Sequence, residues 1–159
     1  MNLRLKIVLY IPMILLIGTL LPGCASTVRN YGNEERNGSE DNTDLRNEFG
    51  NSDVLFTSEG TASYYSDQFH GKLTANGETY NMYGISAAHP EFPLETIVRI
   101  TNLKNNRSVI LRINDRMPDF KGRMIDLSLG AAKELDMLGD GIAKVRLEVL
   151  KWGKGKKKK

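Results

Sequence analysis

The chain has 159 residues and a formal net charge of +3, with one cysteine and two histidines. A single cysteine excludes an internal disulfide, and two histidines without a second cysteine argue against a zinc site, so no metal or other cofactor is expected. The length leaves room for one small folded domain, and the positive charge is concentrated at the two ends of the chain.

The first residues have the pattern of an export signal. Arg4 and Lys6 precede an apolar run at residues 7–21, which is short for a membrane helix and has no stop-transfer pattern. Residues 1–23 are therefore predicted to be a signal peptide.

A lipidation motif follows the apolar run. Leu21-Pro22-Gly23-Cys24 resembles a bacterial lipobox, and lipidation explains an unpaired thiol in an exported protein. A free thiol after an ordinary signal peptide is the alternative. We expect an exported lipoprotein, held in the bacterial cell envelope by acyl chains (palmitate among them) on Cys24. In a Gram-negative cell it would sit in the outer membrane and face the periplasm.

Residues 24–58 have the composition of a disordered linker. Between residues 25 and 58, three basic residues stand against seven acidic ones, and large apolar side chains are almost missing until Val54. Such a segment buries too little apolar surface to fold alone. It is predicted to be a lipidated linker that gives the domain reach.

The middle of the chain is dominated by an apolar alternation of period two, which predicts strands. A helix is also expected, with Ser128 as its N-cap and Leu129, Ala132 and Leu135 as its buried stripe, ended by Gly139. In chain order, the expected elements are strands at 60–65, 97–101 and 108–113, a helix at 129–137, and a strand at 144–149. Many short strands with few helices favour a small closed barrel.

Residues 151–159 form a Lys-rich tail with six lysines. Like charges in a run repel one another, so the tail is expected to be disordered. The tail either keeps the protein soluble or attracts an anionic surface of lipid head groups, lipopolysaccharide or wall polymers. A nucleic-acid partner is not expected, because an exported lipoprotein would not meet one.

The most informative motif is Asn114-Asp115-Arg116-Met117-Pro118, which directly follows the apolar run at 109–113. A carboxyl group held where a rigid strand ends is well placed to donate a proton. The alternative is an ordinary turn with an Asp–Arg ion pair.

Other motifs surround this one in a fixed order. They are Gly60-Thr61-Ala62-Ser63-Tyr64-Tyr65, Phe69-His70-Gly71, Thr74-Ala75-Asn76-Gly77-Glu78, Ala87-Ala88-His89-Pro90 and Gly122-Arg123-Met124-Ile125-Asp126-Leu127-Ser128. This ordered set resembles the rare lipoprotein A (RlpA) family of septal ring lytic transglycosylases. The resemblance implies a mainly β fold, a six-stranded double-psi β-barrel with one or two short helices, over residues 59–150. One departure is Met117, where the family usually has glycine.

The resemblance also implies a function and its residues. The family cleaves peptidoglycan between N-acetylmuramic acid (MurNAc) and N-acetylglucosamine (GlcNAc) during wall remodelling and septation, and leaves 1,6-anhydroMurNAc ends. The matching catalytic positions are Asp115, Glu78 and His89, with Asp115 as acid and then base. Candidate sugar contacts are Thr74, Asn114, Arg116 and Tyr65. The alternative is a non-catalytic, expansin-like lipoprotein that binds peptidoglycan.

Overall fold

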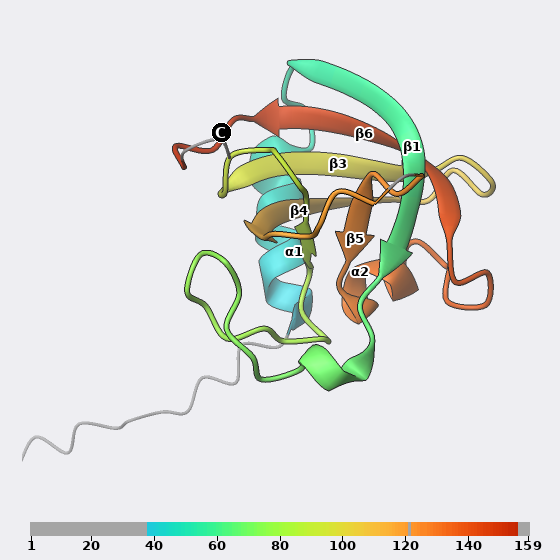
Figure 1. The fold of residues 1–159 in the computed structure, drawn as a ribbon. Helices are drawn as coiled ribbons and strands as arrows, with labels where there is room; N and C mark the ends of the chain where they lie inside the picture. The colour runs from blue at the N-terminus through green and yellow to red at the C-terminus, as the bar shows by residue number, and fades with distance from the viewer. Residues whose placement is uncertain (1–37, 121, 156–159) are drawn as a thin grey trace, which may run out of the picture. The chain divides into compact units, whose positions relative to one another are not determined.

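A computed structural model describes residues 38–120 and 122–155. The predicted signal peptide, Cys24 and the last four lysines lie outside the described residues. Within them, six strands close into a barrel in the order β1-β5-β2-β4-β3-β6 (Figure 1). No helix in the described part of the chain is long and apolar enough to cross a membrane.

The barrel combines long antiparallel ribbons with short parallel pairs. Its strands are β1 (Phe56–Tyr64), β2 (Ser86–Ala88), β3 (Thr96–Asn102), β4 (Ser108–Asp115), β5 (Ile125–Leu127) and β6 (Ala143–Lys151). Strand β6 pairs antiparallel with both β1 and β3, and β3 and β4 form a hairpin. The pairs β1–β5 and β2–β4 are parallel. The four strands expected from the sequence are present, whereas the three-residue strands β2 and β5 had no periodic signal of their own.

Alternating side chains of the long strands fill the barrel. The largest members of this core are fully buried and come mainly from β3, β4 and β6: Val98, Ile100, Val109, Leu111, Ile113, Val145, Leu147 and Val149. Each such side chain contributes roughly 1.5–3 kcal/mol relative to an exposed one. This interior makes the barrel a rigid support for the residues at the strand ends.

Helix α2 (Leu129–Glu134) begins as the sequence predicts but ends earlier. The Ser128 hydroxyl accepts a hydrogen bond from the N–H of Ala131, so Ser128 is the N-cap. Asp136 adopts a left-handed backbone with φ of 52°, which ends the helix before Gly139 is reached. Ala132 and Leu135 are buried as expected, while Leu129 is only partly buried.

Helix α1 (Gly38–Phe49) corrects the prediction of a disordered linker over residues 24–58. Leu45 and Phe49 lie one helical turn apart and pack with three outward-facing barrel residues, Ile97, Ile110 and Leu150. The linker prediction is therefore wrong for this segment. Its few apolar residues are too sparse to show a pattern, and it is the outer face of the barrel that gives them a partner.

The C-terminal end of α1 is also tied to the barrel. Arg99 of β3 donates a hydrogen bond of 2.8 Å to the carbonyl oxygen of Gly50, which follows the helix. A Cβ atom at Gly50 would lie 2.5 Å from the carbonyl oxygen of Arg46, so the chain can turn here only with glycine.

Replacing Phe49 with alanine tests this docking. We expect the free energy of unfolding to fall by about 2–3 kcal/mol, because a nearly buried aromatic ring would leave a cavity on the barrel surface. Urea unfolding measures the loss, and the adjacent exposed Glu48→Ala serves as control. Equal stability of the two variants would mean that α1 does not stabilise the barrel.

Candidate active site

Asp115 is held by donors from three separate parts of the chain. It is the last residue of β4 and is partly exposed. Its Oδ1 accepts hydrogen bonds from the backbone N–H of Ala75, at 2.8 Å, and of Arg116, at 2.7 Å. Its Oδ2 accepts one from the hydroxyl of Tyr65, at 2.9 Å. The carboxyl group therefore has a fixed orientation, with Oδ1 engaged twice and Oδ2 once.

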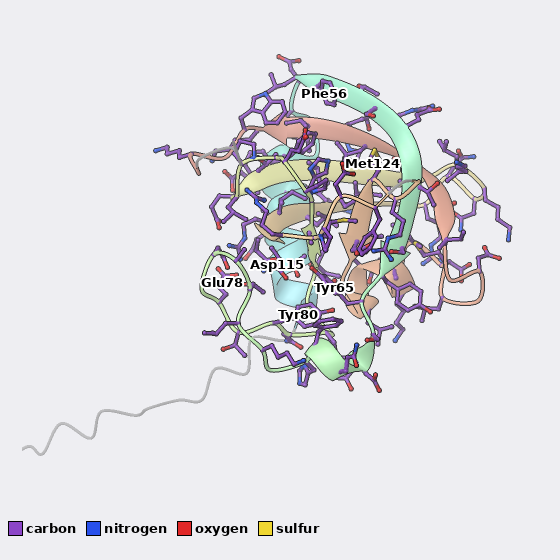
Figure 2. The ribbon with its side chains drawn as sticks, viewed as in Figure 1. Phe56, Tyr65, Glu78, Tyr80, Asp115 and Met124 are labelled. Atoms are coloured by element: carbon purple, nitrogen blue, oxygen red, sulfur yellow. The ribbon has the colours of Figure 1, made fainter. Side chains whose placement is uncertain are left out.

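Tyr65 and Tyr80 form the aromatic support of this carboxyl group (Figure 2). Their ring centroids lie 5.1 Å apart, and Phe69 packs edge-to-face against Tyr65 at 5.4 Å. Burial, and next the negative charge of Asp115, raise the pKa of Tyr65 far above its usual value. Burial also raises the pKa of Tyr80 to about 12. The Tyr65 hydroxyl therefore stays protonated and acts as a donor to Asp115.

Glu78 lies in an ion-pair network rather than against Asp115. Arg112 donates to both of its carboxylate oxygens, at 2.8 and 3.0 Å, and Asn114 donates to Oε2 at 3.2 Å. Burial alone would raise the pKa of Glu78, but the hydrogen bonds from Arg112 and Asn114 and the charge of Arg112 lower it overall. Glu78 is therefore a carboxylate that holds its loop, and not a proton donor.

Arg112 is a site residue that the sequence analysis missed. It also binds Glu95 at 2.8 Å, so a single guanidinium bridges the loop before β2 and the loop after it. Asn76 donates to the same Glu95, at 2.9 Å. The sequence did contain a sign of this role. Arg112 is the one charged residue within the apolar run of β4, and a partly buried charge at such a position needs a partner.

His89 is buried and serves as a neutral acceptor. Its Nδ1 accepts hydrogen bonds from the N–H groups of Glu91 and Phe92, at 3.1 and 3.0 Å, so its proton lies on Nε2. Burial, and next the positive charge of Arg116, lower the pKa of His89 to about 4. Its backbone N–H donates to the carbonyl oxygen of Asp115 at 3.3 Å. His89 therefore organises the loop beside the catalytic candidate.

The other candidates join the same network. Thr74 is buried and its hydroxyl lies 2.6 Å from Oδ1 of Asn76, while Asn114 is buried and bonds Glu78. Thr74 and Asn114 are therefore buried supports of the loop around Glu78. Tyr65 and Arg116 are partly exposed. The guanidinium of Arg116 donates to two backbone carbonyl oxygens, those of His89 at 3.3 Å and Asp115 at 3.5 Å. All seven residues are thus brought together, and their catalytic or sugar-binding roles stay predictions.

Met117, the departure from the family pattern, is accommodated without strain. Its side chain is 3 % exposed, so it fills the interior instead of narrowing an open surface. It is not among the residues with a positive φ, so this position does not require glycine. Among the described residues, no group of three His, Cys, Asp or Glu side chains is placed to hold a metal ion.

Comparison with known proteins identifies the family. A family model described as lytic transglycolase matches residues 57–147. The chain belongs to this family. It is 54 % identical over 97 residues to the endolytic peptidoglycan transglycosylase RlpA of Campylobacter jejuni, covering 61 % of this chain and 35 % of that protein. It is 55 % identical over 89 residues to the RlpA of Pseudomonas aeruginosa, covering 56 % of this chain and 26 % of that protein. The chain thus spans about a third or less of these relatives, and the resemblance read from the motifs is confirmed.

Solved structures confirm the predicted fold class. The Streptomyces papain inhibitor superposes with a TM-score of 0.52 at 21 % identity, covering 64 % of this chain and 100 % of that chain. An expansin of Clavibacter michiganensis gives a TM-score of 0.50 at 19 % identity, covering 63 % of this chain and 53 % of that chain. Both are double-psi barrel folds, so this member of the lytic transglycolase family is a six-stranded double-psi β-barrel.

The neutral state of His89 predicts a pH dependence of stability. Its pKa is about 4 when folded and 6.5 in the absence of the fold, so the unfolded chain binds the proton first as pH falls. Stability should therefore drop between pH 6.5 and pH 4, by about 3 kcal/mol at roughly 1.4 kcal/mol for each pH unit. Urea unfolding across this range measures the drop.

His89→Asn is the matched variant for this experiment. The asparagine Oδ1 can accept the same two N–H groups, but the side chain does not titrate. The component of the pH dependence that belongs to residue 89 should disappear. An unchanged profile would show that His89 is protonated equally in the folded and unfolded states.

Proposed function

We propose that this chain is an endolytic peptidoglycan lytic transglycosylase that cleaves the MurNAc–GlcNAc bond and leaves 1,6-anhydroMurNAc. The observation that carries the proposal is the clamped carboxyl group of Asp115, which keeps a free lone pair on Oδ2 at a partly exposed strand end. Membership of the lytic transglycolase family supports it. So do the relatives named endolytic peptidoglycan transglycosylase, which are identical to this chain at about half of the matched positions.

The proposed reaction uses one carboxyl group twice. The reaction starts from Asp115 with a proton on Oδ2, the oxygen that accepts the hydrogen bond from Tyr65. Asp115 gives this proton to the glycosidic oxygen as the C1–O bond breaks, so GlcNAc leaves with a free hydroxyl. The resulting carboxylate faces the oxocarbenium-like sugar and stabilises its positive charge. The C6 hydroxyl of the same MurNAc then attacks C1, and its proton returns to Asp115. No water is consumed, and the acid is regenerated.

The surrounding residues have positioning roles in this scheme. Tyr65 and the N–H groups of Ala75 and Arg116 keep the carboxyl group aimed, so little reorganisation is needed during the reaction. Glu78, an ionised carboxylate paired with Arg112, holds the loop that carries Ala75. His89 holds the opposite loop through its two N–H contacts.

The proposal extends to the location of the protein. The lipobox at Cys24 supports export and a lipid anchor in the cell envelope. The lysines of the predicted tail at 151–159 support attraction to an anionic surface, although Lys151 is the last residue of β6 and Gly153 is bonded to Thr96, so the tail begins later than the sequence predicts. Peptidoglycan strands are the proposed partner. Helix α1 precedes β1 and packs on the barrel, so residues 38–49 are not part of a free linker.

Asp115→Asn tests the reaction. The release of 1,6-anhydromuropeptides from purified peptidoglycan should fall by about 10²- to 10⁴-fold, because the amide has no proton to donate. The shape and the two backbone contacts to Oδ1 are preserved, so thermal unfolding should be near that of the parent. Asp119→Asn, an exposed position four residues on, is the control. Mass spectrometry of the digest measures the product. Near-normal product from Asp115→Asn would remove Asp115 from the mechanism. A wild type that binds glycan but forms no anhydro product would favour the expansin-like alternative.

Cys24→Ser tests the anchor. The variant should lose its acyl chains and move from the membrane fraction to the soluble fraction, because no other cysteine can carry them. Fractionation in high salt, which screens the lysine tail, measures this. Retention of the variant in washed membranes would place the anchor elsewhere.

A further inference from the structure

Three aromatic rings beside His89 take no part in the proposed chemistry. Phe92 stacks on the His89 imidazole with a centroid distance of 3.8 Å. Trp152 lies 5.1 Å from Phe92, and Phe56 lies 5.9 Å from Phe92 and 6.2 Å from Trp152. Phe56 is 43 % exposed and Trp152 is 38 % exposed. We call Phe56, Phe92 and Trp152 the aromatic platform.

The platform is built largely from outside the family's matched segment. That segment covers residues 57–147, so Phe56 precedes it and Trp152 follows it. The two are close because β1 and β6 pair antiparallel, with Phe56 opposite Val149. In Figure 2, Phe56 lies at the top of the barrel and Asp115 lower down, so the platform extends away from the reaction centre.

Trp152 is held in place by the residue that follows it. The N–H of Gly153 donates to the Thr96 hydroxyl at 3.0 Å, and that buried hydroxyl donates to the carbonyl oxygen of Pro93 at 2.6 Å. A Cβ atom at position 153 would lie 1.9 Å from the carbonyl oxygen of Leu94, so only glycine allows this approach. The chain after β6 is thus pressed onto the loop that carries Phe92, and the rings are ordered before any ligand arrives.

We propose that the aromatic platform is a distal glycan subsite, where pyranose rings of the same peptidoglycan strand stack at a distance from the bond that Asp115 cleaves. The carbon-bound hydrogens on one face of a pyranose match the electron-rich face of an aromatic ring. The inference rests on the proposed function, because it takes the bound strand to run from Asp115 past His89.

Continuity with the reaction centre favours a glycan over a lipid surface. Exposed Val54 and Leu55 precede the platform, and apolar residues with nearby lysines also suit a membrane interface. However, Phe92 stacks on His89, whose backbone N–H binds Asp115. A membrane seated on the platform would crowd the place where the glycan must lie, whereas a strand can occupy both at once.

With a distal subsite, the affinity of the protein would depend on the length of the glycan strand. Long strands would contact both Asp115 and the platform, and short ones only the reaction centre. Binding free energy from the remote rings would then be available only to long strands. This favours cleavage of bonds that lie several sugars from one end of a long strand.

Trp152→Ala in the full-length chain tests the platform. Binding is measured in the Asp115→Asn background, where strands are not cut, with purified peptidoglycan glycan strands of short and long defined lengths. The dissociation constant for long strands should rise about five- to twentyfold, as for the loss of an aromatic anchor, and that for short strands should not change. Trp152→Tyr keeps a ring and should retain most of the affinity.

Ile142→Ala is the matched control. Ile142 is 59 % exposed and precedes β6, whereas Trp152 follows β6, so the two lie at opposite ends of one strand. This variant should bind both strand lengths normally. Thermal unfolding of every variant shows whether a loss of binding comes from a loss of fold.

Three outcomes would overturn the platform. Equal binding of long strands by Trp152→Ala and its parent is the first. An equal loss in Trp152→Tyr and Trp152→Ala, both folded, is the second, because it would leave stacking without a role. The third is measured in the Cys24→Ser background. If Trp152→Ala no longer co-sediments with phosphatidylglycerol vesicles but still binds glycan strands, the rings belong to a membrane-binding surface. Failure of the proposed function itself would appear separately, as a wild type that makes no anhydro product.

Discussion

The hydrogen bonds that hold the carboxyl group of Asp115 depend on the closed barrel, and the site depends on them. The donors come from Tyr65 after β1, from Ala75 in the following loop and from Arg116 at the end of β4. Segments separated by 50 residues meet only because β1 and β4 belong to one closed sheet. If the barrel opened, these donors would move away from Asp115 and the site would be lost, although all of its residues would still be present in the chain.

The neighbours of each site residue determine whether that residue is charged. Arg112 keeps Glu78 ionised and ties it to the loop of Glu95, so two carboxylates share one guanidinium. Burial keeps His89 neutral, and the nearby Arg116 adds to that effect. These assignments leave Asp115 as the carboxyl group that combines partial exposure with a protonated tyrosine donor, and the proposed mechanism therefore uses this one carboxyl group.

The described segments on either side of the matched region pack onto the barrel at two places. Before β1, Phe49 packs against outward-facing residues of the barrel wall. After β6, Gly153 fastens Trp152 to the loop beside His89. The matched segment carries the proposed chemistry, while the flanking residues add support on one face and aromatic surface next to the site.

The sequence by itself determined the long strands, the capped start of α2 and the candidate residues. Period-two alternation and capping chemistry are local, and the ordered motifs carried the family resemblance. Only the tertiary structure decided the rest. Strands β2 and β5 are three residues long and exist through their neighbours, and α1 exists because Ile97, Ile110 and Leu150 cover Leu45 and Phe49. The ionised state of Glu78, the neutral state of His89 and the role of Arg112 likewise depend on distances between loops, which no local pattern encodes.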